Sequence, residues 1–133
     1  MMANNEVVAL QDEQDVVRAR QAVRTRMQEL KFSLVDQTKM ITAASELARN
    51  TVIHGGGGQM SIEVLVNGTR TGVRLTFEDN GPGIADLTLA MTDGWTSGGG
   101  LGMGLPGTKR LVNDFHIESA AGQGTRIVIA RWK

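Results

Sequence analysis

The chain has 133 residues, a length that predicts one domain with a single hydrophobic core. Lysine plus arginine equals aspartate plus glutamate at 14 each, so charge gives no basis for binding nucleic acid or an anionic membrane. The absence of cysteine excludes disulfides and thiolate metal sites. No apolar run approaches the roughly 20 residues that span a bilayer, and the amino-terminal segment lacks the features of a signal peptide, so a cytoplasmic protein is expected.

The first third of the chain predicts one strand and two helices. Residues 6–10 form a short apolar segment that is typical of a strand. Asp12, with Asp15 three residues later, resembles a capping box that begins a helix of about 18 residues. Ser33, followed by Asp36, is a second N-cap, and its helix is expected to end near His54. The apolar stripes expected to pack in the core are Val16, Val17, Ala19, Val23, Met27 and Leu30 on the first helix, and Leu34, Val35, Ile41, Ala44, Leu47, Ala48 and Val52 on the second.

A hairpin is predicted in the middle of the chain. Residues 60–66 and 72–78 alternate apolar and polar side chains, which indicates two strands. Asn67 and Gly68 lie between them, in a connection expected to be longer than a minimal two-residue turn. The second strand delivers the carboxylate of Asp79 to its end.

Glycine is concentrated after this hairpin. Residues 85–92 are compatible with one or two helical turns, and residues 96–104 contain too much glycine for a rigid element. The segment 84–104 is therefore expected to form a mobile lid. A third helix is predicted over residues 105–115, with Pro106 tolerated in its first turn.

The chain ends in a second predicted hairpin. Its strands cover residues 116–121 and 125–132 around Gly122-Gln123-Gly124. The predicted order is strand, helix, helix, strand, strand, lid, helix, strand, strand, and no linker or repeat divides it. One α/β sandwich domain over residues 1–133 is the expected architecture.

Glu46 and Asn50 lie four residues apart on the second predicted helix and project from one face. Magnesium that accompanies a nucleotide keeps most of its coordination positions for water and phosphate oxygens, so the amide oxygen of Asn50 is a suitable ligand. Glu46 would then be free to act as a base. A solvated polar face is the simpler interpretation of an isolated pair of this kind.

Asp79 ends a predicted strand and is followed by two glycines at alternate positions. Its carboxylate can accept a hydrogen bond from the exocyclic amino group of adenine, while Gly81 and Gly83 let the base lie against bare backbone. Guanine would place a carbonyl oxygen opposite the carboxylate, so adenine is favoured. A carboxylate that caps a turn of its own backbone is the alternative.

Gly100, Gly102 and Gly104 offer a row of backbone amides beside the start of the third predicted helix, where phosphate binds favourably. Residues 102–107 also match the glycine pattern of dinucleotide-binding folds, but no apolar strand leads into them. The glycine run therefore predicts a phosphate site without that fold.

Four short motifs occur in order along the chain. They are Glu46-x-x-x-Asn50, Asp79-x-Gly81-x-Gly83, Gly100-x-Gly102-x-Gly104 and Gly122-x-Gly124-Thr125. Together they resemble the N, G1, G2 and G3 boxes of the histidine-kinase-like ATPase superfamily. The resemblance implies a two-layer sandwich, with a mixed sheet covered by helices on one face and ATP held between the second helix and the lid.

The same resemblance implies roles for individual residues, with ATP and Mg²⁺ as the cofactors. It assigns Asn50 to magnesium, Asp79 to adenine and Thr125 to support of the adenine contact. Glu46 would accept the proton of a hydroxyl supplied by a partner protein, while the lid amides bind the phosphates.

The predicted lid departs from the related anti-sigma kinases at one place. An arginine is expected just before the G2 box, where this chain has Gly99 and Gly100. Lys109 or Arg110 is a candidate for the missing charge compensation, and a solvated helix face is the alternative for both.

Within the superfamily, the chain resembles the small protein serine kinases that regulate sigma factors, including the switch kinases of stressosomes. Residues 45–50, 98–107 and 109–111 carry this resemblance. It implies phosphorylation of serine or threonine on STAS-domain antagonist and scaffold proteins of a stressosome. Partner switching would then release the kinase to activate a PP2C-type phosphatase of a general stress response, and a homodimer is compatible with this branch.

Three function classes stay open at this point, in order of preference. They are a protein serine/threonine kinase, an anti-sigma factor with kinase activity that sequesters a sigma factor, and a nucleotide-gated adaptor without catalysis. Glu46 favours catalysis over the adaptor, because ATP binding needs Asn50, Asp79 and the glycines but no base.

Overall fold

The computed structural model describes residues 5–84, 91 and 104–133. Most of the predicted lid, with Gly100 and Gly102 and the helical turns predicted before them, lies outside these ranges. The described elements, in chain order, are β1 (Asn5–Leu10), α1 (Glu13–Glu29), α2 (Leu34–Ile53), β2 (Gly58–Asn67), β3 (Arg70–Asp79), α4 (Gly104–Lys109), β4 (Asp114–Ser119) and β5 (Thr125–Trp132). None of the described helices has the length and hydropathy needed to cross a membrane.

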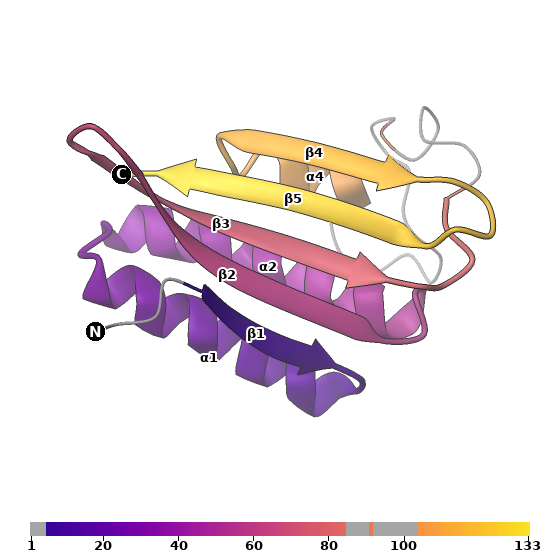
Figure 1. Ribbon diagram of the computed structural model, residues 1–133. Helices are drawn as coiled ribbons and strands as arrows, with labels where there is room; N and C mark the ends of the chain where they lie inside the picture. The colour runs from indigo at the N-terminus through magenta and orange to yellow at the C-terminus, as the bar shows by residue number, and fades with distance from the viewer. Residues whose placement is uncertain (1–4, 85–90, 92–103) are drawn as a thin grey trace.

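The five described strands form one sheet in the order β1-β2-β3-β5-β4, and α1, α2 and α4 lie on one of its faces (Figure 1). This two-layer α/β sandwich confirms the predicted fold class. All four pairs of neighbouring strands are antiparallel, so the expectation of a mixed sheet was wrong. The reason is the place of β5. Strands β3 and β4 run in the same direction, but β5 inserts between them and is antiparallel to both.

Both predicted N-caps are confirmed. The Asp12 side chain accepts a hydrogen bond from the backbone N–H of Asp15 at 3.1 Å, and α1 begins at the next residue after the cap. The Ser33 hydroxyl accepts from the N–H of Asp36 at 3.1 Å in front of α2. These bonds satisfy amides that have no partner inside the first turn of a helix.

Most of the predicted helix stripes are buried, but three of their members are not. Val17 is 45% exposed, Leu34 76% and Val35 62%. Val17 is rotated by about 100° around the helix from Val16, which is in the core. Leu34 and Val35 belong to the first turn of α2, whose first buried residue is Met40.

The β2–β3 connection is shorter than predicted. Asn67 pairs directly with Arg70, so Gly68 and Thr69 form a two-residue turn, with Gly68 at φ +64°. The strand prediction missed the ends of both strands because their residues are polar and break the apolar alternation. Backbone pairing continues through them regardless of side-chain type.

The third predicted helix is also shorter than expected. Helix α4 stops at Lys109, and the N–H of Asn113 already bonds to the carbonyl of Ala130 at 3.0 Å, beside β5. The helix was predicted too long because the apolar residues after α4 have helical spacing. In the structure they pack against the core from a turn (Leu111, Val112) and from β4 (Phe115). The closing hairpin is confirmed.

Candidate functional site

The end of β3 is the centre of the candidate site. Asp79 is the last residue of β3 and pairs with Gly58 of β2 on one side and with Thr125 of β5 on the other. Buried Phe77, two residues earlier, belongs to the core beneath the helices, so by strand alternation Asp79 lies on the same face. Asp79 and Thr125 therefore sit at the end of adjacent strands on the face that the helices cover.

The carboxylate of Asp79 caps a turn of its own backbone, which was one of the two roles that its sequence context suggested. Its Oδ1 accepts a hydrogen bond from the N–H of Gly81 at 2.9 Å, which caps the turn after β3. No hydrogen bond or ion pair from a described residue occupies Oδ2. One oxygen therefore caps the local turn, and the predicted adenine contact would use the other.

The glycines around Asp79 are required by close backbone packing. A Cβ on Gly81 would lie 2.6 Å from the carbonyl oxygen of Gly55, and one on Gly124 would overlap the carbonyl oxygen of Asp79. Gly83, at φ +73°, is restricted in the same way, because a Cβ there would overlap the carbonyl oxygen of Ala120. These contacts hold the β3 end, the loop after α2 and the β4–β5 loop against one another.

Ser119 is a member of the site that the sequence motifs missed. Its hydroxyl accepts from the N–H of Ile84 at 2.7 Å and donates to the carbonyl of Gly124 at 2.8 Å. Its oxygen is also 2.8 Å from Oγ1 of Thr125, which must be the donor because the Ser119 proton is already used. Ser119 therefore ties the chain that enters the lid to the glycine loop and to Thr125. Ser119 pairs with Thr125 in the structure, whereas the predicted hairpin, with its first strand extended to residue 121, placed Ala121 opposite Thr125 and so hid this contact.

Helix α2 brings the second half of the site to the same place. The backbone carbonyl of Asn50 accepts hydrogen bonds from the N–H groups of His54, at 2.9 Å, and Gly55, at 3.1 Å. A Cβ on Gly55 would overlap the Asp79 side chain, so the end of α2 packs directly on the end of β3. The structure thus brings Asn50 and Asp79 together through Gly55, a contact that no motif predicted.

Glu46 lies one helical turn before Asn50 and is 8% exposed. Its Oε1 is 3.8 Å from Nη1 of Arg49, whose Nε is 3.8 Å from Oε1 of Glu13 on α1. Asn50 is half-buried, and its side chain offers the one neutral oxygen that suits a magnesium ion held mainly by water and phosphate oxygens.

Gly104 is buried at the start of α4, with φ +69°, and its carbonyl accepts a hydrogen bond from the hydroxyl of Thr108 at 3.0 Å. Helix α4 packs beside α2. Lys109 and Arg110 are exposed. Their proposed role on phosphate stays a prediction.

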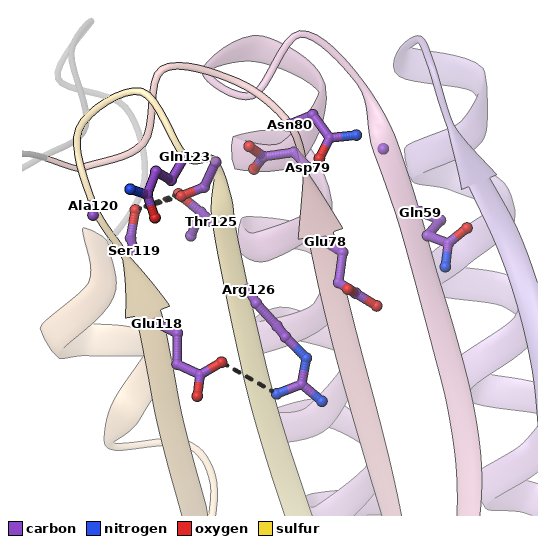
Figure 2. Close-up of a pocket in the computed structure, with 12 residues that line it drawn as sticks. Gln59, Glu78, Asp79, Asn80, Glu118, Ser119, Ala120, Gln123, Thr125 and Arg126 are labelled. Atoms are coloured by element: carbon purple, nitrogen blue, oxygen red, sulfur yellow. Dashed lines mark hydrogen bonds and ion pairs between the residues drawn. The ribbon is translucent and has the colours of Figure 1, made fainter.

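A cavity of about 670 Å³ opens at the same end of the sheet (Figure 2). Asp79, Gly124 and Thr125 line it, and it extends over the face without helices. Gln59, Glu78, Arg126 and Glu118 lie in one row across β2, β3, β5 and β4 and point into it. Neither Glu46 nor Asn50 lines it, so this cavity is distinct from the predicted magnesium position.

Residues 35–133 match the model of the histidine kinase-, DNA gyrase B-, and HSP90-like ATPases. The chain belongs to this family. It is also 44% identical to the serine/threonine-protein kinase RsbT of Bacillus subtilis, over 98% of both chains. The protein is therefore a serine/threonine-protein kinase.

Two further proteins are similar to this chain. The anti-sigma F factor of Clostridium novyi is 30% identical over 85% of this chain and 82% of its own. A crystal structure of the RsbU and RsbW domains of a Mycobacterium tuberculosis protein matches 97% of this chain with a TM-score of 0.69. That match has 20% identity and spans 32% of the solved chain, so it shows a shared fold.

Proposed function

We propose that the protein transfers the γ-phosphate of ATP to a serine or threonine of a partner protein, with Glu46 as the general base and Asn50 as the protein ligand of magnesium. The observation that carries this proposal is the packing of α2 on β3. It places Glu46 and Asn50 one turn apart on a helix whose end touches the Asp79 side chain through Gly55.

The contacts support a separate role for each residue of the site. Oδ2 of Asp79, which accepts no hydrogen bond from a described residue, is suited to the amino group of adenine, with Thr125 beside it on β5. Magnesium, when bound, would neutralise charge on the phosphate oxygens. The lid glycines, with Gly104 at the start of α4, are proposed to donate amides to the phosphates. Glu46 would receive the hydroxyl proton as the acceptor oxygen attacks, and the phosphoryl group would leave ADP.

The relatives support a regulatory setting for this transfer. The 44% identity to a kinase named RsbT favours STAS-domain antagonist and scaffold proteins of a stressosome as substrates, with release of the kinase to a PP2C-type phosphatase. A cytoplasmic location is proposed with it, because ATP and sigma factors are found there. A homodimer also stays a proposal.

A second candidate function is an anti-sigma factor with kinase activity. The 30% identity to an anti-sigma F factor over 85% of the chain favours it. Binding of a co-encoded sigma factor in the presence of ATP would separate this function from the stress-switch kinase, which is expected not to bind one.

The first test is transfer of labelled γ-phosphate from ATP to a co-encoded STAS-domain protein, with the acceptor residue located by mass spectrometry. Glu46→Gln should bind ATP like the parent but lower the transfer rate at least about 100-fold, because the amide keeps the shape and loses the basicity. Omission of magnesium should abolish transfer.

Glu29→Gln on α1 serves as the control for the loss of one carboxylate elsewhere on the helical layer. It should transfer phosphate like the parent. An equal transfer rate for Glu46→Gln and the parent would remove Glu46 as the base, and labelling of no STAS-domain protein would redirect the search to other substrates.

A further inference from the structure

Arg49 lies between two carboxylates at the point where α1 and α2 meet. Its Nη1 is 3.8 Å from Oε1 of Glu46, and its Nε is 3.8 Å from Oε1 of Glu13, the first residue of α1. The family motif contains Glu46 and Asn50 but assigns nothing to Arg49, one of the three residues between them. We propose that Arg49 is a positioning residue of the phosphotransfer reaction, which attracts the Glu46 carboxylate without a hydrogen bond and so leaves it free to accept a proton; this inference rests on the proposed role of Glu46.

The environment of Glu46 strengthens the effect of a neighbouring cation. Its side chain is 10% exposed, and charge pairs that are partly buried are screened less by salt than exposed pairs. Among the described residues, Arg49 is the one side chain within ion-pair or hydrogen-bond distance of the Glu46 carboxylate. An arginine keeps its charge at any physiological pH, so its compensation of Glu46 is permanent.

The distance between the two groups is as informative as their charges. At 3.8 Å the nitrogen and oxygen attract each other but are too far apart for a hydrogen bond. Arg49 therefore donates no hydrogen bond to the Glu46 carboxylate. Among the described residues, every side-chain oxygen that is fully buried has a hydrogen bond. The Glu46 oxygens have no hydrogen bond from a described residue, so they are in contact with solvent. A carboxylate in this state can accept the proton of an incoming hydroxyl.

Glu13 is the second carboxylate near Arg49. It attracts the other side of the guanidinium from α1, and it is itself 68% exposed. Arg49 is 40% exposed and lies at the same distance from both carboxylates. The arginine is therefore shared between two helices, and the start of α1 is connected to the proposed base.

The test compares the steady-state kinetics of substitutions at Arg49 under the labelled-phosphate assay. Arg49→Gln should lower kcat about tenfold, a part of the 10²- to 10⁴-fold typical of a general base, because Glu46 loses its cation. The KM for ATP should stay within about twofold, since Arg49 acts on the base and not on nucleotide binding. Arg49→Lys should restore most of the rate, because it returns the charge.

Arg74→Gln is the matched control, since Arg74 is 41% exposed and pairs with Glu63 on the far face of the sheet. It should leave kcat unchanged. Thermal unfolding of all variants identifies any loss of rate that comes from unfolding. A parental kcat for Arg49→Gln, or a failure of Arg49→Lys to restore the rate, would overturn the inference.

A double variant separates this inference from the proposed function. If Arg49 acts only through Glu46, adding Arg49→Gln to Glu46→Gln should not lower kcat further. A further tenfold loss in that background would show that Arg49 acts on its own and would overturn the positioning role. Full activity of Glu46→Gln alone would instead overturn the proposed base.

Discussion

At the scale of single residues, Asp79 has a structural role beside its proposed binding role. It uses one oxygen to cap the turn at Gly81, and its other oxygen accepts no hydrogen bond from a described residue. Sequence reasoning treated turn capping and base recognition as alternatives, because a one-dimensional pattern does not say how many oxygens of a carboxylate a turn consumes. The structure makes them compatible.

The residue-scale prediction concerns Gly124. It has φ +78°, and a Cβ there would overlap the carbonyl oxygen of Asp79. Gly124→Ala should lower the free energy of unfolding by about 1–3 kcal/mol and should weaken ATP binding, because relief of the overlap displaces the end of β3. Urea unfolding and ATP titration by calorimetry measure the two effects.

Gly122 provides the control for this substitution. Its φ of +77° is nearly the same, but a Cβ there would meet nothing within 4 Å. Gly122→Ala should therefore show only the backbone strain, about 1–2 kcal/mol, and should bind ATP like the parent. Equal ATP affinity for the two variants would mean that the Gly124 contact does not position Asp79.

At the scale of elements, helix starts were predictable and strand ends were not. The caps at Asp12 and Ser33 are local hydrogen bonds over three residues, so the sequence contains all of their information. The two-residue turn after Asn67 depends on pairing of polar strand ends with the neighbouring strand. Such pairing is a backbone interaction between segments, and side-chain alternation does not report it.

The element-scale prediction concerns the pairing of β2 with β3. Two hydrogen bonds from Arg74, at 3.1 and 2.8 Å, hold the pKa of Glu63 below its ordinary value of 4.5, and the same contact raises the pKa of Arg74. A lowered pKa in the folded state stabilises the fold above pH 4.5, and this stabilisation is lost as pH falls through the folded-state value.

Glu63→Gln should therefore lower the free energy of unfolding at neutral pH and lose this effect in acid. Urea unfolding of parent and variant at about pH 7 and about pH 3 measures the difference. Glu78→Gln, on the same face of β3 and without an ion pair to a described residue, should show no such pH dependence. A constant difference between Glu63→Gln and the parent across this range would contradict the pairing.

At the scale of the whole molecule, the core is the interior between one sheet face and the helices. Leu47 is fully buried there, whereas Leu34 is 76% exposed although both are apolar residues of α2. Leu47→Ala should lower the free energy of unfolding by about 2–5 kcal/mol, and Leu34→Ala should change it by less than about 0.5 kcal/mol. Urea unfolding of the two variants checks the contrast, and similar losses would contradict it.

The sequence by itself determined the order of the described elements, both helix caps and, through its glycine motifs, the family. Each of these features depends on the types of residues that lie close together in the sequence. Only the tertiary structure decided that β5 lies between β3 and β4, that Gly55 packs on Asp79, and that Arg49 stands between two acids on different helices. Strand order and interhelical contacts arise when distant segments pair their backbones and bury a common apolar face, and local spacing does not contain that information.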